Sequence, residues 1–188
     1  MSDFVSSLKK LISVCEEKGV TFVSLLEPGR KREEILQEAQ AIGLTFPEDL
    51  IELYEYCDGV DATKHRSNDI ALYSGYWLLP LHHAVQDHLR LQQDENGDID
   101  PSWFPLLTLD GDYYFVDCAL AASGEPYVIN YTPESDPEAE YTTLQSMIET
   151  FADCFRENAF VVSDGKIIEY DGRLEAEITR RHNPEVQH

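Results

Sequence analysis

The densest group of titratable side chains in the sequence is His82, His83, Asp87 and His88. His83 and Asp87 are four residues apart, so a helix would place both of them on one face. A metal site would need a third converging ligand, and the H-E-x-x-H pattern of zinc peptidases is absent. We therefore expect a polar helix face with an ordinary His83–Asp87 pair and no bound metal.

The acidic run Asp94–Asp100 (DENGDID) has the composition of a calcium-binding loop. Counted from Asp94, however, position 6 is Ile99, where such a loop has glycine, and position 12 is Pro105, where it has glutamate. Because the coordination scheme fails at both positions, we expect a solvated loop here.

The four cysteines, Cys15, Cys57, Cys118 and Cys154, form no C-x-x-C pair. A cysteine nucleophile needs a histidine base that a third group orients, and the sequence places no such group. Free cysteine is among the most buried residue types, so we predict reduced, buried thiols. Glycine-rich phosphate loops, a G-x-S-x-G elbow and a Rossmann fingerprint are also absent. We expect no catalytic residues and no cofactor.

The segment 91–155 contains no lysine, arginine or histidine but carries 14 acidic residues. These are Asp94, Glu95, Asp98, Asp100, Asp110, Asp112, Asp117, Glu125, Glu134, Asp136, Glu138, Glu140, Glu149 and Asp153. They supply most of the net charge of −22, whereas the remaining residues, with 22 acids and 14 bases, are nearly balanced. A field of one sign repels polyanions and attracts cations, so nucleic acid and anionic membrane are poor partners and a basic protein is a good one. The alternative is a surface that only improves solubility.

The composition indicates a folded cytoplasmic protein. At 188 residues, of which 43% are hydrophobic, the chain is long enough for one domain, 1–188, with a packed core. The N-terminal residues MSDFVSSLKKLISV lack the features of a signal peptide, and no apolar run approaches the ~20 residues that cross a bilayer.

Apolar residues recur at helical spacing in several segments. The predicted helices are 4–18, 31–42, one that begins at Pro47, 81–93, 141–158 and 174–181. Extended segments are predicted at 70–73 and 76–79 as one hairpin, 104–109 and 113–118 as a second, and then at 127–131, 160–162 and 167–170. A polar loop is predicted over 132–140. Helices first, hairpins in the middle and a late helix packed against them indicate an α+β fold with a largely antiparallel sheet of about five to six strands.

Three segments, in order along the chain, carry a family resemblance. FPEDL at 46–50, continuing through Leu53 and Tyr54 to Asp58-Gly59, resembles the helix signature of the SUKH superfamily, which includes yeast cell-wall-assembly regulators and many bacterial immunity proteins. The run 103–106 (WFPL), followed by DGDYYFVD at 110–117, resembles the family's hairpin, and the late helix over 144–155 is similar to its last element. Asp58 stands where the family usually has asparagine, and the approach to the Gly111-Asp112 pair is shortened.

The resemblance implies three parts, namely an N-terminal helical extension (1–30), a family-like core (31–158) and a C-terminal extension (159–188). The residues that match the family motif are expected to be structural: Pro47, Leu53, Tyr54, Asp58, Gly59, Trp103, Gly111, Asp112 and Asp117. We favour local backbone hydrogen bonds for the carboxylates of Asp112 and Asp117, although either one could also contact a partner.

The resemblance also implies a binding protein without enzymatic activity. Our leading hypothesis is a bacterial immunity protein that covers the active site of a cognate basic toxin, plausibly a nuclease. The alternatives are an intracellular regulatory or scaffold protein and, third, a hydrolase that uses a histidine or cysteine. The expected partner-binding residues are Asp94, Asp98, Asp100, Asp110, Asp112, Tyr114, Glu134, Asp136, Glu138 and Glu140. We take Tyr114 as the outward-facing anchor and Tyr113 as inward-facing, with the reverse assignment as the alternative.

Overall fold

The computed structural model describes residues 2–65, 67–93, 99–133 and 135–186. Its helices are α1 (Asp3–Lys18), the 3₁₀ helix η1 (Thr21–Leu25), α2 (Arg32–Ala41), α3 (Glu48–Tyr56), α4 (Ser67–Ile70), α5 (Leu81–Leu91), α6 (Cys118–Ala121), α7 (Leu144–Arg156) and α8 (Gly172–His182). Its strands are β1 (Trp77–Leu78), β2 (Trp103–Leu109), β3 (Asp112–Asp117), β4 (Val128–Tyr131), β5 (Glu138–Tyr141), β6 (Phe160–Ser163) and β7 (Lys166–Tyr170).

The central sheet has five strands in the order β1-β2-β3-β4-β5, and every neighbouring pair is antiparallel. The strands β6 and β7 form a separate antiparallel pair. Helices precede and follow the sheet along the chain, so the predicted α+β fold is confirmed.

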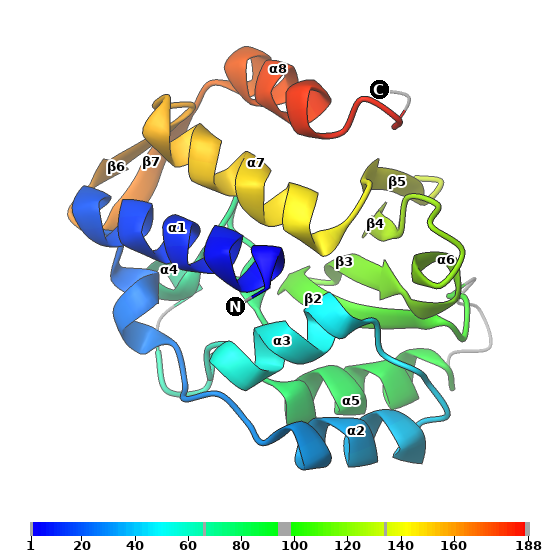
Figure 1. The fold of residues 1–188 in the computed structure, drawn as a ribbon. Helices are drawn as coiled ribbons and strands as arrows, with labels where there is room; N and C mark the ends of the chain where they lie inside the picture. The colour runs from blue at the N-terminus through cyan, green and yellow to red at the C-terminus, as the bar shows by residue number, and fades with distance from the viewer. Residues whose placement is uncertain (1, 66, 94–98, 134, 187–188) are drawn as a thin grey trace.

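Helices cover both sides of the central sheet. In Figure 1, α7 lies over one side with α1 and α8 packed against it, and α5 and α2 lie over the other. Because both faces are covered, consecutive residues of a central strand are buried in opposite directions. Tyr113, Tyr114, Phe115 and Val116 of β3 are therefore all buried.

Helix α7 contributes the largest apolar face above the sheet. Leu144, Met147, Ile148 and Phe151 lie three or four residues apart and are all buried, as the helical spacing predicts. Thr143 begins the helix, because its side chain accepts a hydrogen bond from the amide of Ser146, and the Ser146 hydroxyl accepts from the amide of Thr143.

The hairpin predicted over 70–79 is partly wrong, because only its turn at Ser74-Gly75 and a short part of its second strand are formed. Ile70 ends helix α4, and a single bridge between Tyr73 and Tyr76 forms around a tight turn. Only Trp77 and Leu78 form a strand, and that strand pairs with β2. A short apolar segment has no periodicity long enough to distinguish a helix from a strand, so its tertiary partner decides.

The polar loop predicted over 132–140 is partly wrong, because Glu138–Tyr141 forms the edge strand β5. Tyr141, predicted to begin the late helix, belongs to this strand instead, and the helix begins at Leu144. The sequence EAEY has few apolar residues, since an edge strand needs to bury little of its surface.

The register of the sheet places the acidic residues at two opposite ends. Tyr113 of β3 pairs with Tyr131 of β4, so the turn between β2 and β3 and the connection between β4 and β5 lie at the same end. Asp110 lies in that turn, and Asp112 is the first residue of β3 after it. Trp103 pairs with Asp117 at the other end, which is also where β2 begins.

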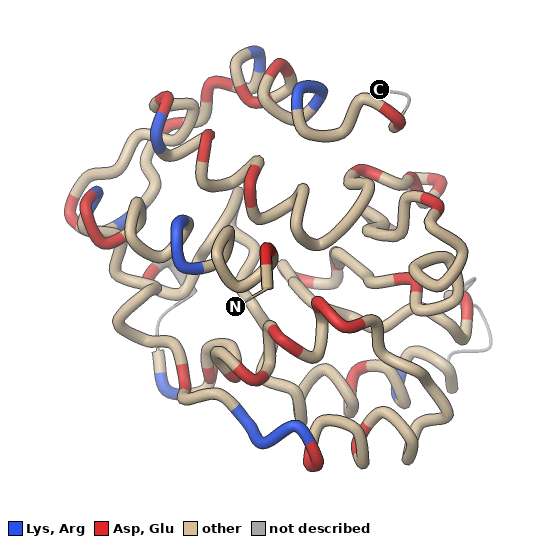
Figure 2. Tube along the Cα trace, in the orientation of Figure 1, with Lys and Arg blue, Asp and Glu red and all other residues tan. Residues whose placement is uncertain are grey.

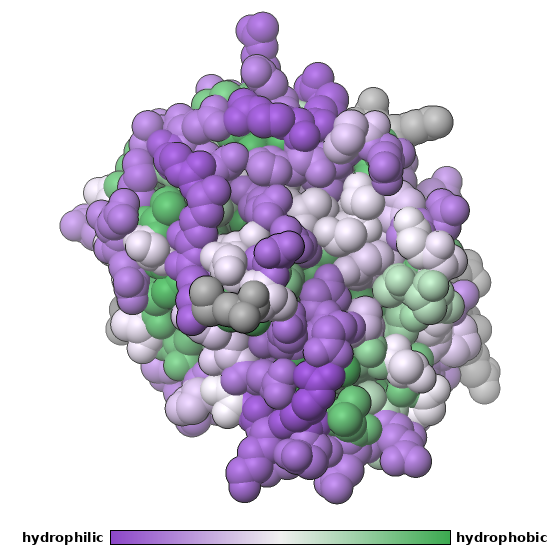
Figure 3. Space-filling view, in the orientation of Figure 1, coloured by the Kyte–Doolittle hydropathy of each residue, from purple (hydrophilic) through white to green (hydrophobic). Residues whose placement is uncertain are grey.

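The face shown in Figure 3 is mostly hydrophilic, with apolar residues in separate patches. No helix within the described ranges has the length and apolar character needed to cross a membrane.

Candidate functional site

A groove of about 1070 Å³ lies between helix α8 and the β4–β5 hairpin. One wall consists of residues 130–133 and 135–140, and the other is the face of α8 that carries Gly172, Glu175, Ala176 and Thr179. Four carboxylates line it, from Asp136, Glu138, Glu140 and Glu175, and none of the described lining residues is basic. We call this feature the acidic groove. Figure 2 shows acidic residues gathered at β5, which forms its wall.

Asn130, Glu140 and Glu175 form what we call the floor of the acidic groove. Hydrogen bonds hold the two carboxylates of this floor in place. The oxygen Oε2 of Glu140 accepts from Nδ2 of Asn130 at 2.7 Å and from the Tyr114 hydroxyl at 2.9 Å. The Tyr73 hydroxyl donates to Glu175 of α8. Strands β3, β4 and β5, the turn before β1 and helix α8 therefore converge on one polar network.

Burial raises the pKa of Glu175 above its ordinary value; the hydrogen bond from Tyr73 opposes this effect, and the nearby charge of Glu140 adds to it. Burial, followed by the charges of these two glutamates, also raises the pKa of the Tyr73 hydroxyl. Tyr73 therefore stays protonated at neutral pH and acts as a donor. Two half-buried carboxylates that repel each other form a site that would favour a cation.

The basic residues neutralise acids elsewhere in the molecule. Seven of the described Lys and Arg side chains form ion pairs: Arg30, Arg32, Lys64, Arg90, Arg156, Lys166 and Arg181. Among the pairs that join described residues, Asp153 is the only acid of 91–155 that contacts a Lys or Arg. The carboxylates of the acidic groove therefore keep their charge uncompensated within the described part of the chain.

We expect Glu175→Gln to raise the midpoint of thermal unfolding at pH 7. A carboxyl whose pKa is raised by folding favours the folded state when it is protonated, and this contribution is lost as the pH rises through the folded pKa. At about pH 3.5, below the ordinary pKa, both states are protonated and the substitution should have little effect. Glutamine removes the charge and can still accept from Tyr73.

Glu177→Gln is the matched control, because Glu177 is exposed on the same helix. Thermal unfolding followed by circular dichroism at both pH values measures the two variants. Equal midpoints for parent and Glu175→Gln at pH 7 would contradict the assigned burial of this carboxylate.

The structure separates the acids predicted to bind a partner. Asp136, Glu138 and Glu140 line the acidic groove, and Asp110 and Asp112 lie at the same end of the sheet. Asp100 lies at the opposite end, where its side chain accepts from the amide and hydroxyl of Ser102. Asp94, Asp98 and Glu134 lie outside the described residues.

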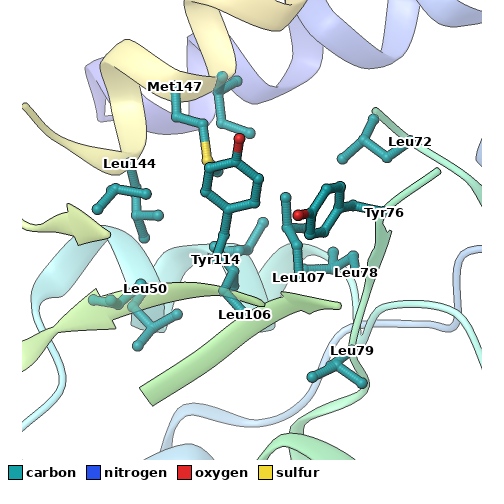
Figure 4. Close-up of a cluster of buried hydrophobic side chains, with 14 of the residues drawn as sticks. Leu50, Leu72, Tyr76, Leu78, Leu79, Leu106, Leu107, Tyr114, Leu144 and Met147 are labelled. Carbon is teal, nitrogen blue, oxygen red and sulfur yellow. The ribbon is translucent and has the colours of Figure 1, made fainter. Parts of the chain in front are cut away.

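The prediction that Tyr114 faces outward is wrong. Its side chain is 2% exposed, and Tyr113 is 4% exposed. Figure 4 shows the Tyr114 ring among leucines and Met147, with its hydroxyl directed away from the strand. Both faces of the sheet carry helices, so neither tyrosine can anchor a partner at the surface.

The motif around Asp58 and Gly59 has a structural role. The oxygen Oδ1 of Asp58 accepts from the amide of Leu81 at 2.8 Å and so satisfies the first residue of α5. Gly59 has φ +69°. Upstream, Pro47 precedes the first residue of α3, and Tyr54, fully buried beside the buried Leu53, donates to the carbonyl of Leu79.

The Trp103–Asp117 motif is also structural. The indole Nε1 of Trp103 donates to Oδ2 of Asp117 at 2.9 Å, and Oδ1 of Asp117 accepts from the amides of Ala119 and Leu120. The carboxylate of Asp117 therefore makes the local backbone hydrogen bonds that we favoured from the sequence. At the other end, Gly111 makes the turn with φ +106°, and the carbonyl of Asp112 accepts from the Thr108 hydroxyl.

The side chains of His82, His83, Asp87 and His88 do not form a common metal site within the described part of the chain. Asp87 accepts from Arg90 and from the Tyr113 hydroxyl, so the predicted pairing with His83 is not found among the described residues. His88 is buried, and its Nδ1 donates to the carbonyl of Trp103 at 3.0 Å. Within the described ranges, no group of three His, Cys, Asp or Glu side chains is arranged to hold a metal.

All four cysteines are free and buried, which confirms that prediction. Burial raises the pKa of the Cys15, Cys57 and Cys118 thiols to about 12. At neutral pH these thiols are protonated and are poor nucleophiles.

Three residues of the hydrogen-bond network at the groove were not anticipated from the sequence, namely Tyr73, Asn130 and Glu175. The one local signal is in α8, where Gly172, Ala176 and Thr179 recur at helical spacing beside Glu175. Small residues on one helix face leave space beside the helix, and here Glu175 lies among them at the wall of the acidic groove. The strand that completes this cavity is distant in sequence.

Comparison with protein families gives one match. The model of the SMI1 / KNR4 family (SUKH-1) matches residues 31–157. Comparison with curated proteins gives no match. The matched residues contain the β4–β5 wall of the acidic groove, whereas α8 follows them in the chain.

Proposed function

The chain belongs to the SMI1 / KNR4 family (SUKH-1), and from this premise we propose that it neutralises a basic toxin domain by binding it and covering its active site. Membership supports a protein-interaction or immunity-type role at the level of the family. The toxin, its basic surface and the inhibition by occlusion are our proposal.

The observation that carries this proposal is the uncompensated charge of the acidic groove. Its four carboxylates have no basic residue beside them among the described lining residues. Enzymes that act on nucleic acid bind phosphates with lysine and arginine, and carboxylates can take the place of those phosphates. A basic nuclease is therefore the class of toxin that fits this groove, and nucleic acid itself would be repelled.

The binding requires no chemical step by this protein. The described cysteines are buried, with raised thiol pKa values for Cys15, Cys57 and Cys118, and His88 of α5 is buried with its Nδ1 donating to the carbonyl of Trp103. We accordingly propose that it is not an enzyme. A regulatory or scaffold protein that acts through other partners is the alternative outcome of the following test.

The test combines capture with protection. The tagged protein is purified from its native organism at low and at high salt, and proteins released by salt are identified by mass spectrometry. We expect a basic protein with a toxin domain. The purified pair should form a stable complex, and co-expression should restore growth to cells that produce the toxin.

His83→Ala and Cys57→Ser should protect as well as the parent, provided that circular dichroism shows that they are folded. Loss of protection by either folded variant would contradict binding without chemistry. A captured partner that is not toxic would favour the scaffold alternative.

A further inference from the structure

We propose that the floor of the acidic groove is a subsite for one arginine side chain of the partner, with its guanidinium group between the carboxylates of Glu140 and Glu175. This inference rests on the proposed function, because it specifies how the same groove recognises a basic partner. It adds the residue type that is recognised and the two carboxylates that recognise it.

The first observation is the pair of buried polar atoms that have no hydrogen-bond partner among the described residues. The Tyr141 hydroxyl and Oδ1 of Asn130 are both in this state. Tyr141 is 0% exposed and does not line the groove; the groups that act on its hydroxyl are those of Tyr114, Glu140 and Tyr73, and its interaction with Glu140 falls short of a full hydrogen bond. Buried polar groups without partners are rare and costly, so their presence indicates that the network is incomplete.

The second observation is an excess of acceptors at the floor. Among the described residues, the hydrogen bonds to Glu140 all go to its Oε2, and Glu175 accepts through Oε1 from Tyr73. Oε1 of Glu140 and Oε2 of Glu175 therefore accept no full hydrogen bond from a described donor, and Oδ1 of Asn130 accepts none either. The missing group must supply several donors and a positive charge.

A guanidinium group meets this requirement better than an ammonium group. It has five N–H donors in one plane, so it can donate to two carboxylates from different elements at once. It is also less strongly hydrated, which suits a half-buried floor. Tyr131, Pro137 and Ala176 line the same groove and offer surface for the aliphatic part of the side chain.

The probes are the capped tripeptides acetyl-Gly-Arg-Gly-amide, its lysine analogue and its citrulline analogue, which keeps the shape of arginine without the charge. Titrations are followed by ¹⁵N NMR of the full-length protein. We expect the arginine peptide to shift the side-chain amide of Asn130 and the backbone amide of Thr179. We expect it to bind about tenfold more tightly than the citrulline peptide, which is the loss expected for one charge-assisted hydrogen bond.

Glu175→Gln should weaken binding of the arginine peptide by about tenfold. Glu177→Gln, with the same change of charge on an exposed position of α8, should leave it within about twofold, as expected for a screened surface charge. In the parent protein, ¹³C NMR of the Glu175 carboxyl should show its pKa falling when the arginine peptide binds, because a cation favours the ionised form.

Equal binding of the arginine and citrulline peptides would overturn the inference and leave water as the partner of the buried atoms. Equal binding of the lysine peptide would overturn the choice of arginine. If the peptides fail but a purified basic toxin still binds in a salt-dependent way, the subsite is wrong and the proposed function stands. If the arginine peptide binds at the floor but no toxin is neutralised, the subsite is correct and the proposed function is wrong.

Discussion

Replacing Gly59 with alanine is expected to lower the free energy of unfolding by about 3 kcal/mol, because it combines backbone strain with overpacking. Gly59 has φ +69°, where an L side chain is strained. A Cβ atom there would lie 2.6 Å from the carbonyl carbon of Leu79 and 2.7 Å from the carbonyl oxygen of Leu78. These are backbone atoms, which cannot rotate away as a side chain could.

Gly19→Ala provides the matched control. Gly19 has φ +73°, almost the same backbone conformation, but apart from its chain neighbours no atom of the described residues lies within 4 Å of the position that its Cβ would take. We expect this control to cost about 1 kcal/mol, from backbone strain alone. Urea unfolding of both variants gives the comparison, and for a chain of this size the Gly59 substitution should lower Tm by about 6–12 °C. If both substitutions lower the free energy of unfolding equally, the close approach of Gly59 to the backbone of Leu78 and Leu79 is wrong.

Reversing the two exposed charges at the rim of the acidic groove should have the largest effect on function. We expect Asp136→Lys with Glu138→Lys to slow association with the basic partner by about tenfold or more at low salt, because clustered charges of one sign steer a cationic surface. The difference should shrink as salt is added, since ions screen the field. Surface plasmon resonance over a salt series measures both the rate and its salt dependence.

Glu33→Lys with Glu125→Lys is the control for that experiment. It makes the same change in net charge, and both residues are exposed outside the groove, on α2 and before β4. We expect its association rate to stay within about threefold of the parent, because steering depends on where the charge lies. If both variants slow association equally, total charge and not the acidic groove attracts the partner.

Only one of the two walls of the acidic groove belongs to the part of the chain that matches the family. Its β4–β5 wall lies within the family match, whereas α8, with Glu175, lies beyond it. Helix α8 packs on α7 through the buried Ile178 and through Asn183, whose side chain joins Thr150 of α7 and the amide of Thr142. A family core and a following helix therefore share the site, so changes on either wall can adjust which partner fits.

Features that depend on near neighbours could be predicted from the sequence. The spacing of Leu144, Met147 and Phe151 indicated α7, because the contacts that define an amphipathic helix are three and four residues apart. The turn at Asp110-Gly111 indicated the β2–β3 hairpin for the same reason. The motif residues were enough to predict the family, and the acidic run 91–155 supports the proposal of a basic partner.

Tertiary structure alone decided which acids act together and which tyrosines are buried. Glu175 comes near Glu140 because α8, packed on α7, faces β5 across the acidic groove, and these residues are far apart in the sequence with no shared local pattern. Tyr114 is buried because helices cover both faces of the sheet, whereas the alternation of a strand shows only that neighbours point in opposite directions. Asp100 and Asp136 have the same chemistry in the sequence, but the strand register places them at opposite ends of the sheet.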